Sequence, residues 1–227
     1  MRIVDLSQGW WTGMPTFGAD WYPNFEMSRV MTPSSDPARV DRTFSQYTIF
    51  PHNATHVESS LHFFPDGEEL DAVAIATFVG WACVADLSSK TDLEPVSGED
   101  LDLALDGRWQ MGDRLLIRTD HPQRHLGQDD YWDTAPFVTP SAADWIIENG
   151  AALVGLDCLT ERPGDPSFPI HRRLLSAGVP ILENMANLHD LSQSECLLFA
   201  APIKIADVEA APVRAIALEG VSRTDVM

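Results

Sequence analysis

The segment PHNATHVESSLHF, residues 51–63, places three histidines and one glutamate within eleven positions. The whole chain of 227 residues contains only seven histidines. Imidazole and carboxylate groups are common protein ligands of zinc and related divalent ions. A single histidine is more often a hydrogen-bonded or solvated side chain, but four ionisable groups this close together favour a metal site.

The backbone path of this segment decides whether its side chains can meet. On an α-helix, which turns about 100° per residue, His52 and His56 share a face but Glu58 points away from it. On a straight strand all the candidates face one side, yet at about 3.3 Å per residue His52 and Glu58 lie about 20 Å apart. Ligands of one ion lie only about 2 Å from it. We therefore expect the chain to leave the preceding strand at Pro51 and to curl.

Two later residues extend the candidate site. His171 lies in PIHRRLLSAG, an expected helix on which Leu174 and Leu175 share its face, so that this face is expected to turn inward. Glu183 lies in the apolar stretch PILENM, where burying a carboxylate without a cation is costly. The plain alternatives are a hydrogen-bonded core histidine and a glutamate at a wet rim. Together with the first cluster, the two residues predict the second half of a metal centre.

Composition limits the possible partners. Lys and Arg total 15 against 34 Asp and Glu, for a formal net charge of −19, which repels phosphate backbones and anionic lipid. The start MRIVDLSQGWW has no apolar run of signal-peptide length, and no stretch approaches the roughly 20 apolar residues of a spanning helix. We expect a soluble cytoplasmic protein that binds a small molecule and neither nucleic acid nor a membrane.

Short apolar, β-rich runs recur along the chain and are separated by Gly, Pro, Asp or Ser. We expect strands at 3–6, 25–31, 45–50, 82–87, 114–119, 152–159, 180–185 and 196–203. We expect helices at 97–105, 139–150 and 169–177, the first two with Ser97 and Thr139 as N-caps. We expect loops at 31–42, 121–137 and 159–169, rich in Pro, Gly and Asp. The pattern predicts an α/β single domain over 1–227 with a mixed, barrel-like sheet and flanking helices.

The three cysteines are far apart in the sequence. Cys83, Cys158 and Cys196 fall in apolar stretches and are expected to be reduced core thiols.

The spacing His52-x-x-Thr55-His56-x-Glu58-x-x-x-His62 resembles the His-x-Gly-Thr-His-x-Asp-x-Pro-x-His signature of the cyclase-like metal-dependent hydrolases. That family includes bacterial kynurenine formamidase and isatin hydrolase. Other parts of the chain are similar to the family in the same order: VDLSQGWWTGMPTF (4–17), GDRLLIRT (112–119), VGLDCLT (154–160) and HRRLLSAGVPILENMANLHDL (171–191). This combination is specific to the family but not to one substrate.

The resemblance implies a swivelling β/β/α fold, a homodimer or higher homo-oligomer, and one or two divalent ions per subunit, zinc or manganese. It implies that Glu58 belongs to both ion positions, that His62 is the catalytic acid/base and that Phe17 contacts the substrate. The implied metal ligands are His52, His56, Glu58, His171 and Glu183.

Three positions depart from the family pattern. Glu58 replaces Asp, so its carboxylate reaches one methylene farther and can change the metal spacing or the number of ions. Ala54 replaces Gly, which requires a negative φ at that position. Ser60 replaces Pro, which loosens the turn or adds a hydroxyl to the pocket. These departures bear on substrate identity.

The resulting prediction is a metal-dependent hydrolase of a small cyclic amide, a lactone or an N-formyl compound such as an aryl formamide. Metal-activated water is the expected nucleophile, because the chain has no Gly-x-Ser-x-Gly elbow and no cysteine beside a histidine. Two alternatives remain from the sequence: a metal-free binding or assembly protein on the same fold, and a metal-dependent cyclase or dehydratase.

Overall fold

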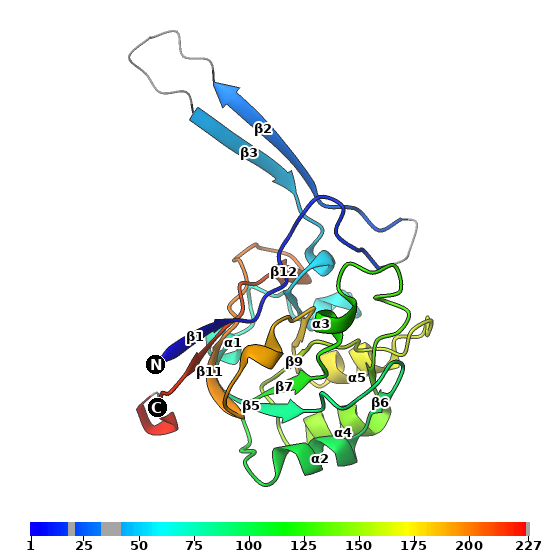
Figure 1. The fold of residues 1–227 in the computed structure, drawn as a ribbon, viewed down its shortest axis with the longest axis vertical. Helices are drawn as coiled ribbons and strands as arrows, with labels where there is room; N and C mark the ends of the chain where they lie inside the picture. Colours follow the sequence, from blue (N-terminus) through cyan, green and yellow to red (C-terminus); the bar gives the residue numbers. More distant parts are fainter. Residues whose placement is uncertain (18–20, 33–41, 226–227) are drawn as a thin grey trace.

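The computed structural model describes residues 1–17, 21–32 and 42–225 (Figure 1). Its main feature is a nine-stranded mixed sheet in the order β1-β13-β11-β5-β7-β9-β10-β4-β12. The central strands β5, β7, β9 and β10 are parallel, and the strands on either side of them pair antiparallel. The strands are β1 (Arg2–Asp5), β4 (His56–Glu58), β5 (Val79–Asp86), β7 (Arg114–Arg118), β9 (Leu153–Leu156), β10 (Ile181–Glu183), β11 (Glu195–Phe199), β12 (Ala210–Pro212) and β13 (Ile216–Glu219).

The two ends of this sheet share one hydrophobic core. Val57 on β4 and Ala211 on β12 are buried in the same cluster as Val4 on β1 and Ala217 on β13. Strands at opposite edges can meet in this way only if the sheet curls, so the sheet forms a half-barrel. The predicted α/β class with a mixed, barrel-like sheet is confirmed.

Three helices cover the other face of the sheet: α2 (Gly98–Leu105), α4 (Pro140–Glu148) and α5 (Pro169–Ser176) (Figure 1). Each connects consecutive parallel strands, as crossover connections in parallel sheets do. The predicted N-cap of α2 is confirmed: the Ser97 side chain accepts from the Asp100 N–H while the Asp100 side chain accepts from the Ser97 N–H. Thr139 caps α4 by accepting from the Ala142 N–H.

The central strands are buried on both faces. On β7, Leu115 and Ile117 pack in the core under the helices, whereas Leu116 packs in the core inside the half-barrel. This alternation follows from the two-residue period of a strand. Continuous apolar runs are typical of parallel strands covered on both sides. All three cysteines are buried and free, as predicted.

A two-stranded antiparallel ribbon of β2 (Glu26–Thr32) and β3 (Arg42–Thr48) stands apart from the main sheet (Figure 1). The predicted loop at 31–42 lies for the most part outside the described residues. The exposed side chains of the ribbon include Met27 and Tyr47, which pair across it and are 47% and 60% exposed. An isolated two-stranded ribbon is only marginally stable in water, and this ribbon lies outside the core of the main sheet.

Several short elements were not predicted. The strands β4, β6 (Pro95–Val96), β8 (Phe137–Val138) and β12 have two or three residues each, too few to show a period-two pattern. The four-residue β13 was also missed. Two short helices, α1 (Ile75–Phe78) and α3 (His121–His125), were missed as well. The prediction of an entirely irregular loop at 121–137 was wrong, because α3 begins it and β8 ends it; HPQRH has no apolar periodicity to reveal the helix. None of the described helices has the length and apolarity needed to cross a bilayer.

Candidate metal centre

The histidine-rich segment is folded as two tight turns on either side of a short strand. A 3₁₀ turn covers Pro51–Asn53, β4 covers His56–Glu58, and a second 3₁₀ turn covers Ser60–His62. The predicted curl after Pro51 is therefore present. It brings Nδ1 of His52 to 2.7 Å from Oε1 of Glu58, whereas a straight strand holds the two residues about 20 Å apart.

Two of the departures from the family pattern have local explanations. Ala54 has a φ of −134°, an extended conformation that any residue adopts, so glycine is not required there. The Ser60 hydroxyl accepts a hydrogen bond from the Glu68 N–H at 2.8 Å. Ser60 therefore joins its turn to the segment at Glu68, and it is not among the residues that line the pocket.

The first half of the centre consists of His52, His56 and Glu58. One ligand atom from each of the three lies within 4.8 Å of the others. Nδ1 of His56 lies 2.7 Å from the Ala54 carbonyl oxygen and donates to it, which leaves Nε2 facing Glu58 Oε1 at 3.1 Å. A backbone carbonyl in this role is typical of metal-ligating histidines, since it fixes the tautomer and aims the other nitrogen.

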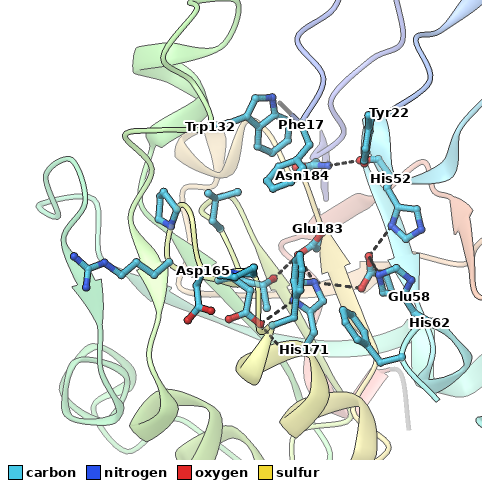
Figure 2. A pocket seen from close by; sticks show the side chains of 18 of the residues that line it. Phe17, Tyr22, His52, Glu58, His62, Trp132, Asp165, His171, Glu183 and Asn184 are labelled. Atoms are coloured by element: carbon cyan, nitrogen blue, oxygen red, sulfur yellow. Dashed lines mark hydrogen bonds and ion pairs between the residues drawn. The ribbon is translucent and has the colours of Figure 1, made fainter. Parts of the chain in front are cut away.

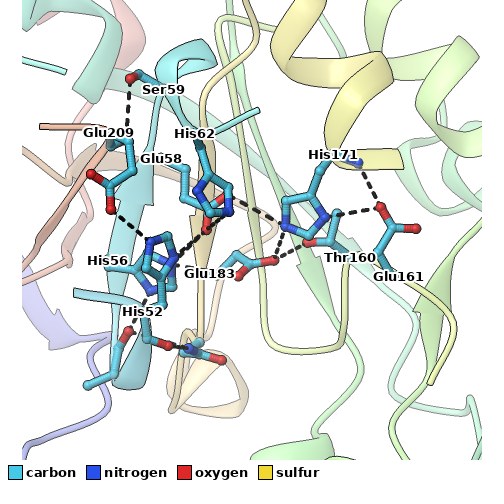
Figure 3. A network of polar contacts seen from close by, with 12 residues as sticks. His52, His56, Glu58, Ser59, His62, Thr160, Glu161, His171, Glu183 and Glu209 are labelled. Carbon is cyan, nitrogen blue, oxygen red and sulfur yellow. Dashed lines mark hydrogen bonds and ion pairs between the residues drawn. The ribbon is translucent and has the colours of Figure 1, made fainter. Parts of the chain in front are cut away.

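The second half joins Glu58 to His171 and Glu183, again with one ligand atom of each within 4.8 Å of the others. β10 pairs antiparallel with β4, so that Glu183 lies opposite His56 and its side chain shares the face of β4 that carries Glu58. His171, in the first turn of α5, places Nε2 3.2 Å from Glu183 Oε1 and 3.5 Å from Glu58 Oε2. Figure 3 shows Glu183 between the histidines of the 51–63 segment and His171.

The Glu58 carboxylate has the features of a cation ligand. Glu58 is 1% exposed, and its buried Oε2 atom has no hydrogen-bond partner among the residues that the structure describes. A buried carboxylate oxygen without a hydrogen bond is costly, and a bound cation removes that cost. Two carboxylates and three imidazoles form a donor set that suits zinc and manganese. The residues present therefore fit a divalent ion.

The electrostatics of the centre follow from burial and charge pairing. Burial raises the pKa of Glu58, but the neighbouring His171 and His52 outweigh burial and hold this pKa well below its usual value. Burial lowers the pKa of His52, but its contacts with Glu209 and Glu58 raise it to about 9. The pKa of His171 is likewise raised, against burial, by Glu183 and Glu58. Without a metal, protonated imidazoles supply the positive charge that the carboxylates require.

His62 lies at the end of the second turn, beside the ligand candidates. Its ring stacks on His52 at 4.5 Å, and its Nε2 lies 3.8 Å from Glu58 Oε1. Its side chain is 28% exposed, more than the other histidines of the centre. Burial lowers the pKa of His62 below its ordinary value. His62 is therefore a neutral imidazole at pH 7 and can accept a proton.

Three polar residues that the sequence did not single out support the ligand candidates. Glu161 accepts from Nδ1 of His171 at 3.0 Å and from the His171 backbone N–H at 2.8 Å. Glu209 lies 3.2 Å from Nε2 of His52, and the Thr160 hydroxyl donates to Glu183. They lie in loops, 10, 157 and 23 residues along the chain from the residues they hold, so no local spacing in the sequence reveals them. Thr160 and Glu161 belong to the predicted loop at 159–169.

The centre opens into a pocket of about 640 Å³ whose walls include seven aromatic side chains. Phe17 lies in this wall, with Trp132 at 5.9 Å between ring centroids. Figure 2 shows Phe17, Trp132 and Tyr22 on the opposite side of the pocket from His62 and His171. The aromatic residues that line the pocket are Phe17, Trp21, Tyr22, Phe50, Phe63, Trp132 and Phe168.

Sequence comparison supports this architecture. A family model described as "Putative cyclase" matches residues 4–161. Over 215 residues the chain is 26% identical to a kynurenine formamidase of Bacillus cereus, which covers 94% of this chain and 95% of that protein. Over 217 residues it is 26% identical to a kynurenine formamidase of Bacillus anthracis, which covers 95% and 96% respectively.

Solved structures agree with the sequence match. Isatin hydrolase A from Labrenzia aggregata, bound to benzyl benzoate, is similar with a TM-score of 0.81 at 25% identity, covering 95% of this chain and 93% of that one. Isatin hydrolase A from Ralstonia solanacearum has the same fold, with a TM-score of 0.81 at 24% identity and coverage of 95% and 91%. The family match spans more than half of the chain, and the relatives over nearly its whole length are hydrolases. The chain therefore belongs to the cyclase family and is an enzyme of the hydrolase type.

Proposed function

We propose that this enzyme hydrolyses a small aromatic N-formyl compound, cyclic amide or lactone at a divalent metal centre. The observation that carries the proposal is the buried Glu58 carboxylate. Its Oε2 has no hydrogen-bond partner in the described part of the chain and lies 3.5 Å from Nε2 of His171. The proposed metal ligands are His52, His56, Glu58, His171 and Glu183.

The metal is zinc or manganese, since imidazole and carboxylate ligands suit both. Glu58 belongs to both ligand groups, which favours two ions that share its carboxylate over one ion bound by a single group. A bound divalent ion of this kind lowers the pKa of water from 15.7 to about 7 and polarises a carbonyl oxygen.

The protein's own residues then have distinct tasks. Nε2 of His62 takes up a proton from the attacking water and returns it to the leaving nitrogen or oxygen, a role typically worth about 10²–10⁴-fold in rate. Glu161 holds His171 through its Nδ1 atom, and Glu209 holds His52 through its Nε2 atom, so that both imidazoles keep one orientation.

The substrate class rests on the pocket. Aromatic rings bind flat apolar groups at low entropic cost, and the pocket volume of about 640 Å³ suits a compound of one or two rings. Phe17 and Trp132 contact the aromatic part of the substrate in this proposal. The two kinds of relatives, named kynurenine formamidase and isatin hydrolase, favour an aryl formamide or a cyclic aryl amide over a lactone.

The test is metal removal followed by reconstitution. We expect the protein stripped by a chelator to lose hydrolysis of aryl formamides and cyclic aryl amides, and zinc or manganese to restore it. Full activity after thorough stripping contradicts the proposal. A cyclase or dehydratase remains the alternative activity, and mass analysis of the products separates it, because hydrolysis adds one water to the substrate and dehydration removes one.

We further propose that the enzyme is a cytoplasmic homodimer and that 1–227 forms one domain. The β2–β3 ribbon supports the dimer, because its exposed Met27 and Tyr47 lie on an element that has no core of its own.

A further inference from the structure

A second group of potential ligands shares no residue with the metal centre described above. It consists of His121 and His125 on α3 and Asp92 in the loop after β5. One ligand atom from each of the three lies within 4.8 Å of the others. The geometry points to a separate divalent cation site formed by Asp92, His121 and His125, of the kind that takes Zn²⁺.

The buried imidazole of His121 carries the inference. His121 is 1% exposed, and its Nε2 atom lies 2.8 Å from the Tyr131 carbonyl oxygen, to which it donates. This bond places the ring proton on Nε2 and leaves a lone pair on Nδ1. The Nδ1 atom is buried and has no hydrogen-bond partner within the described ranges 1–17, 21–32 and 42–225. A ring nitrogen held by a carbonyl while the other nitrogen is free is the usual arrangement of a metal-ligating histidine.

Both ring nitrogens of His125 face carboxylates. Its Nδ1 atom lies 3.4 Å from Asp130 Oδ1, and its Nε2 atom lies 3.2 Å from Asp92 Oδ1. His121 and His125 are four residues apart on a helix and share a face, where their rings stack at 4.7 Å. Binding requires the His125 ring to turn toward the ion, which its partly exposed position at the end of α3 allows. Two imidazoles and a carboxylate suit zinc, and water can complete the coordination.

The position is open to solvent, and Asp92 brings a carboxylate to it. Asp92 and His125 line a surface hollow of about 560 Å³, so an ion can reach them from solvent. The two nearby basic side chains are engaged elsewhere. Lys90 Nζ lies 3.0 Å from Asp100, and the Arg124 guanidinium donates to the carbonyl oxygens of Thr119 and Lys90.

A cation here connects to the substrate pocket. Tyr131, whose carbonyl holds His121, also stacks on the His121 ring at 5.1 Å. The next residue, Trp132, lines the pocket beside Phe17. Zinc bound to Asp92, His121 and His125 therefore joins the loop after β5 to the segment that carries Trp132, and it stabilises that wall of the pocket.

The experiment compares zinc content and hydrogen exchange between the wild-type chain and Asp92→Asn. Asp92 is half exposed, so this variant is expected to fold. After dialysis against Zn²⁺, we expect Asp92→Asn and His125→Ala to contain one equivalent of zinc fewer than the wild type. His189→Ala, which alters a histidine outside both clusters, is expected to lose none. Zinc is also expected to slow amide exchange over 121–133 in the wild type and in His56→Ala, but not in Asp92→Asn.

Equal zinc content in the wild type and Asp92→Asn overturns the inference, as does zinc protection of 121–133 that survives in Asp92→Asn. Because the readout is a difference of one equivalent, it does not depend on whether the main centre binds metal. Failure of the proposed hydrolase activity and failure of this site are therefore distinguishable.

Discussion

Nε2 of His171 lies 3.5 Å from Oε2 of Glu58, although the two residues come from an early strand and a late helix. Glu58 Oε2 has no hydrogen-bond partner among the described residues, and Glu183 approaches the same imidazole at 3.2 Å. The fold thus brings together two segments that are distant in the sequence, and a cation or a proton is needed there to balance the carboxylates.

Removing the proposed acid/base is expected to separate chemistry from metal binding. His62 stacks on His52 but belongs to neither group proposed to hold the ions. We expect His62→Asn to lower kcat by about 10²–10⁴-fold while metal content stays at the wild-type level. Steady-state kinetics and elemental analysis of the same sample measure both quantities. A His62→Asn enzyme with wild-type kcat excludes this role.

The carboxylate behind His171 is expected to act on metal affinity. Glu161 accepts from Nδ1 and from the backbone N–H of His171, so it fixes the ring that faces Glu58. We expect Glu161→Gln to weaken metal binding by about 10–100-fold. Asp165 lies in the same loop but accepts a hydrogen bond from Ser167, so Asp165→Asn serves as the matched control. This variant is expected to bind metal with wild-type affinity. Competition with a chromogenic chelator measures both variants, and equal affinities refute the role of Glu161.

The stability of the metal-free protein is expected to depend on pH in a defined direction. The pKa of His52 is raised from 6.5 to about 9 by Glu209 and Glu58, despite burial. The folded state therefore binds more protons than the unfolded state between these values, so the stabilisation is fully present below pH 6.5 and is lost as the pH rises through about 9. We expect the free energy of unfolding to fall across that window, and His171 to contribute in the same direction.

Urea titrations of the metal-free protein at both ends of the window measure this slope. His52→Asn is expected to have a smaller slope than the wild type, because only the contribution of His171 remains. A wild-type stability that rises with pH over this range contradicts the charge balance described for the centre.

The ribbon of β2 and β3 is expected to hold the dimer. Met27 and Tyr47 are cross-strand partners and are both exposed in the single chain. We expect Met27→Ser combined with Tyr47→Ser to shift the protein toward monomer in sedimentation experiments. Leu103→Ser, which replaces an apolar residue on α2 that is even more exposed, at 72%, is the control and is expected to leave the dimer intact. A wild-type protein that sediments as a monomer refutes the dimer itself.

The sequence predicted those parts of the fold whose signals are local. β7 and β9 are apolar runs bounded by turn residues, and α2 begins with a capping box at Ser97, so their positions follow from neighbouring residues. β4 and β12 have three residues each and exist because they pair with each other, with β4 also pairing with β10. A local sequence pattern cannot predict a strand that is stabilised only by pairing with other strands.

The same distinction applies to the site. The ligand candidates were found because three of them lie with His62 in one short segment and because the chain resembles a family whose signatures include His171 and Glu183. Glu161, Glu209 and Thr160 were missed, since each is an ordinary loop residue until the fold places it beside a histidine or a carboxylate. Trp132 was missed for the same reason, as it reaches the pocket from a loop with no periodic pattern.

The most direct test of the central claim is anomalous diffraction from crystals of the metal-loaded protein. We expect density for at least one ion in contact with the Glu58 carboxylate, at the usual distance of about 2.0–2.2 Å for zinc, with His56 or His171 beside the ion. Ordered metal elsewhere in the crystal, with none in contact with Glu58, contradicts the account.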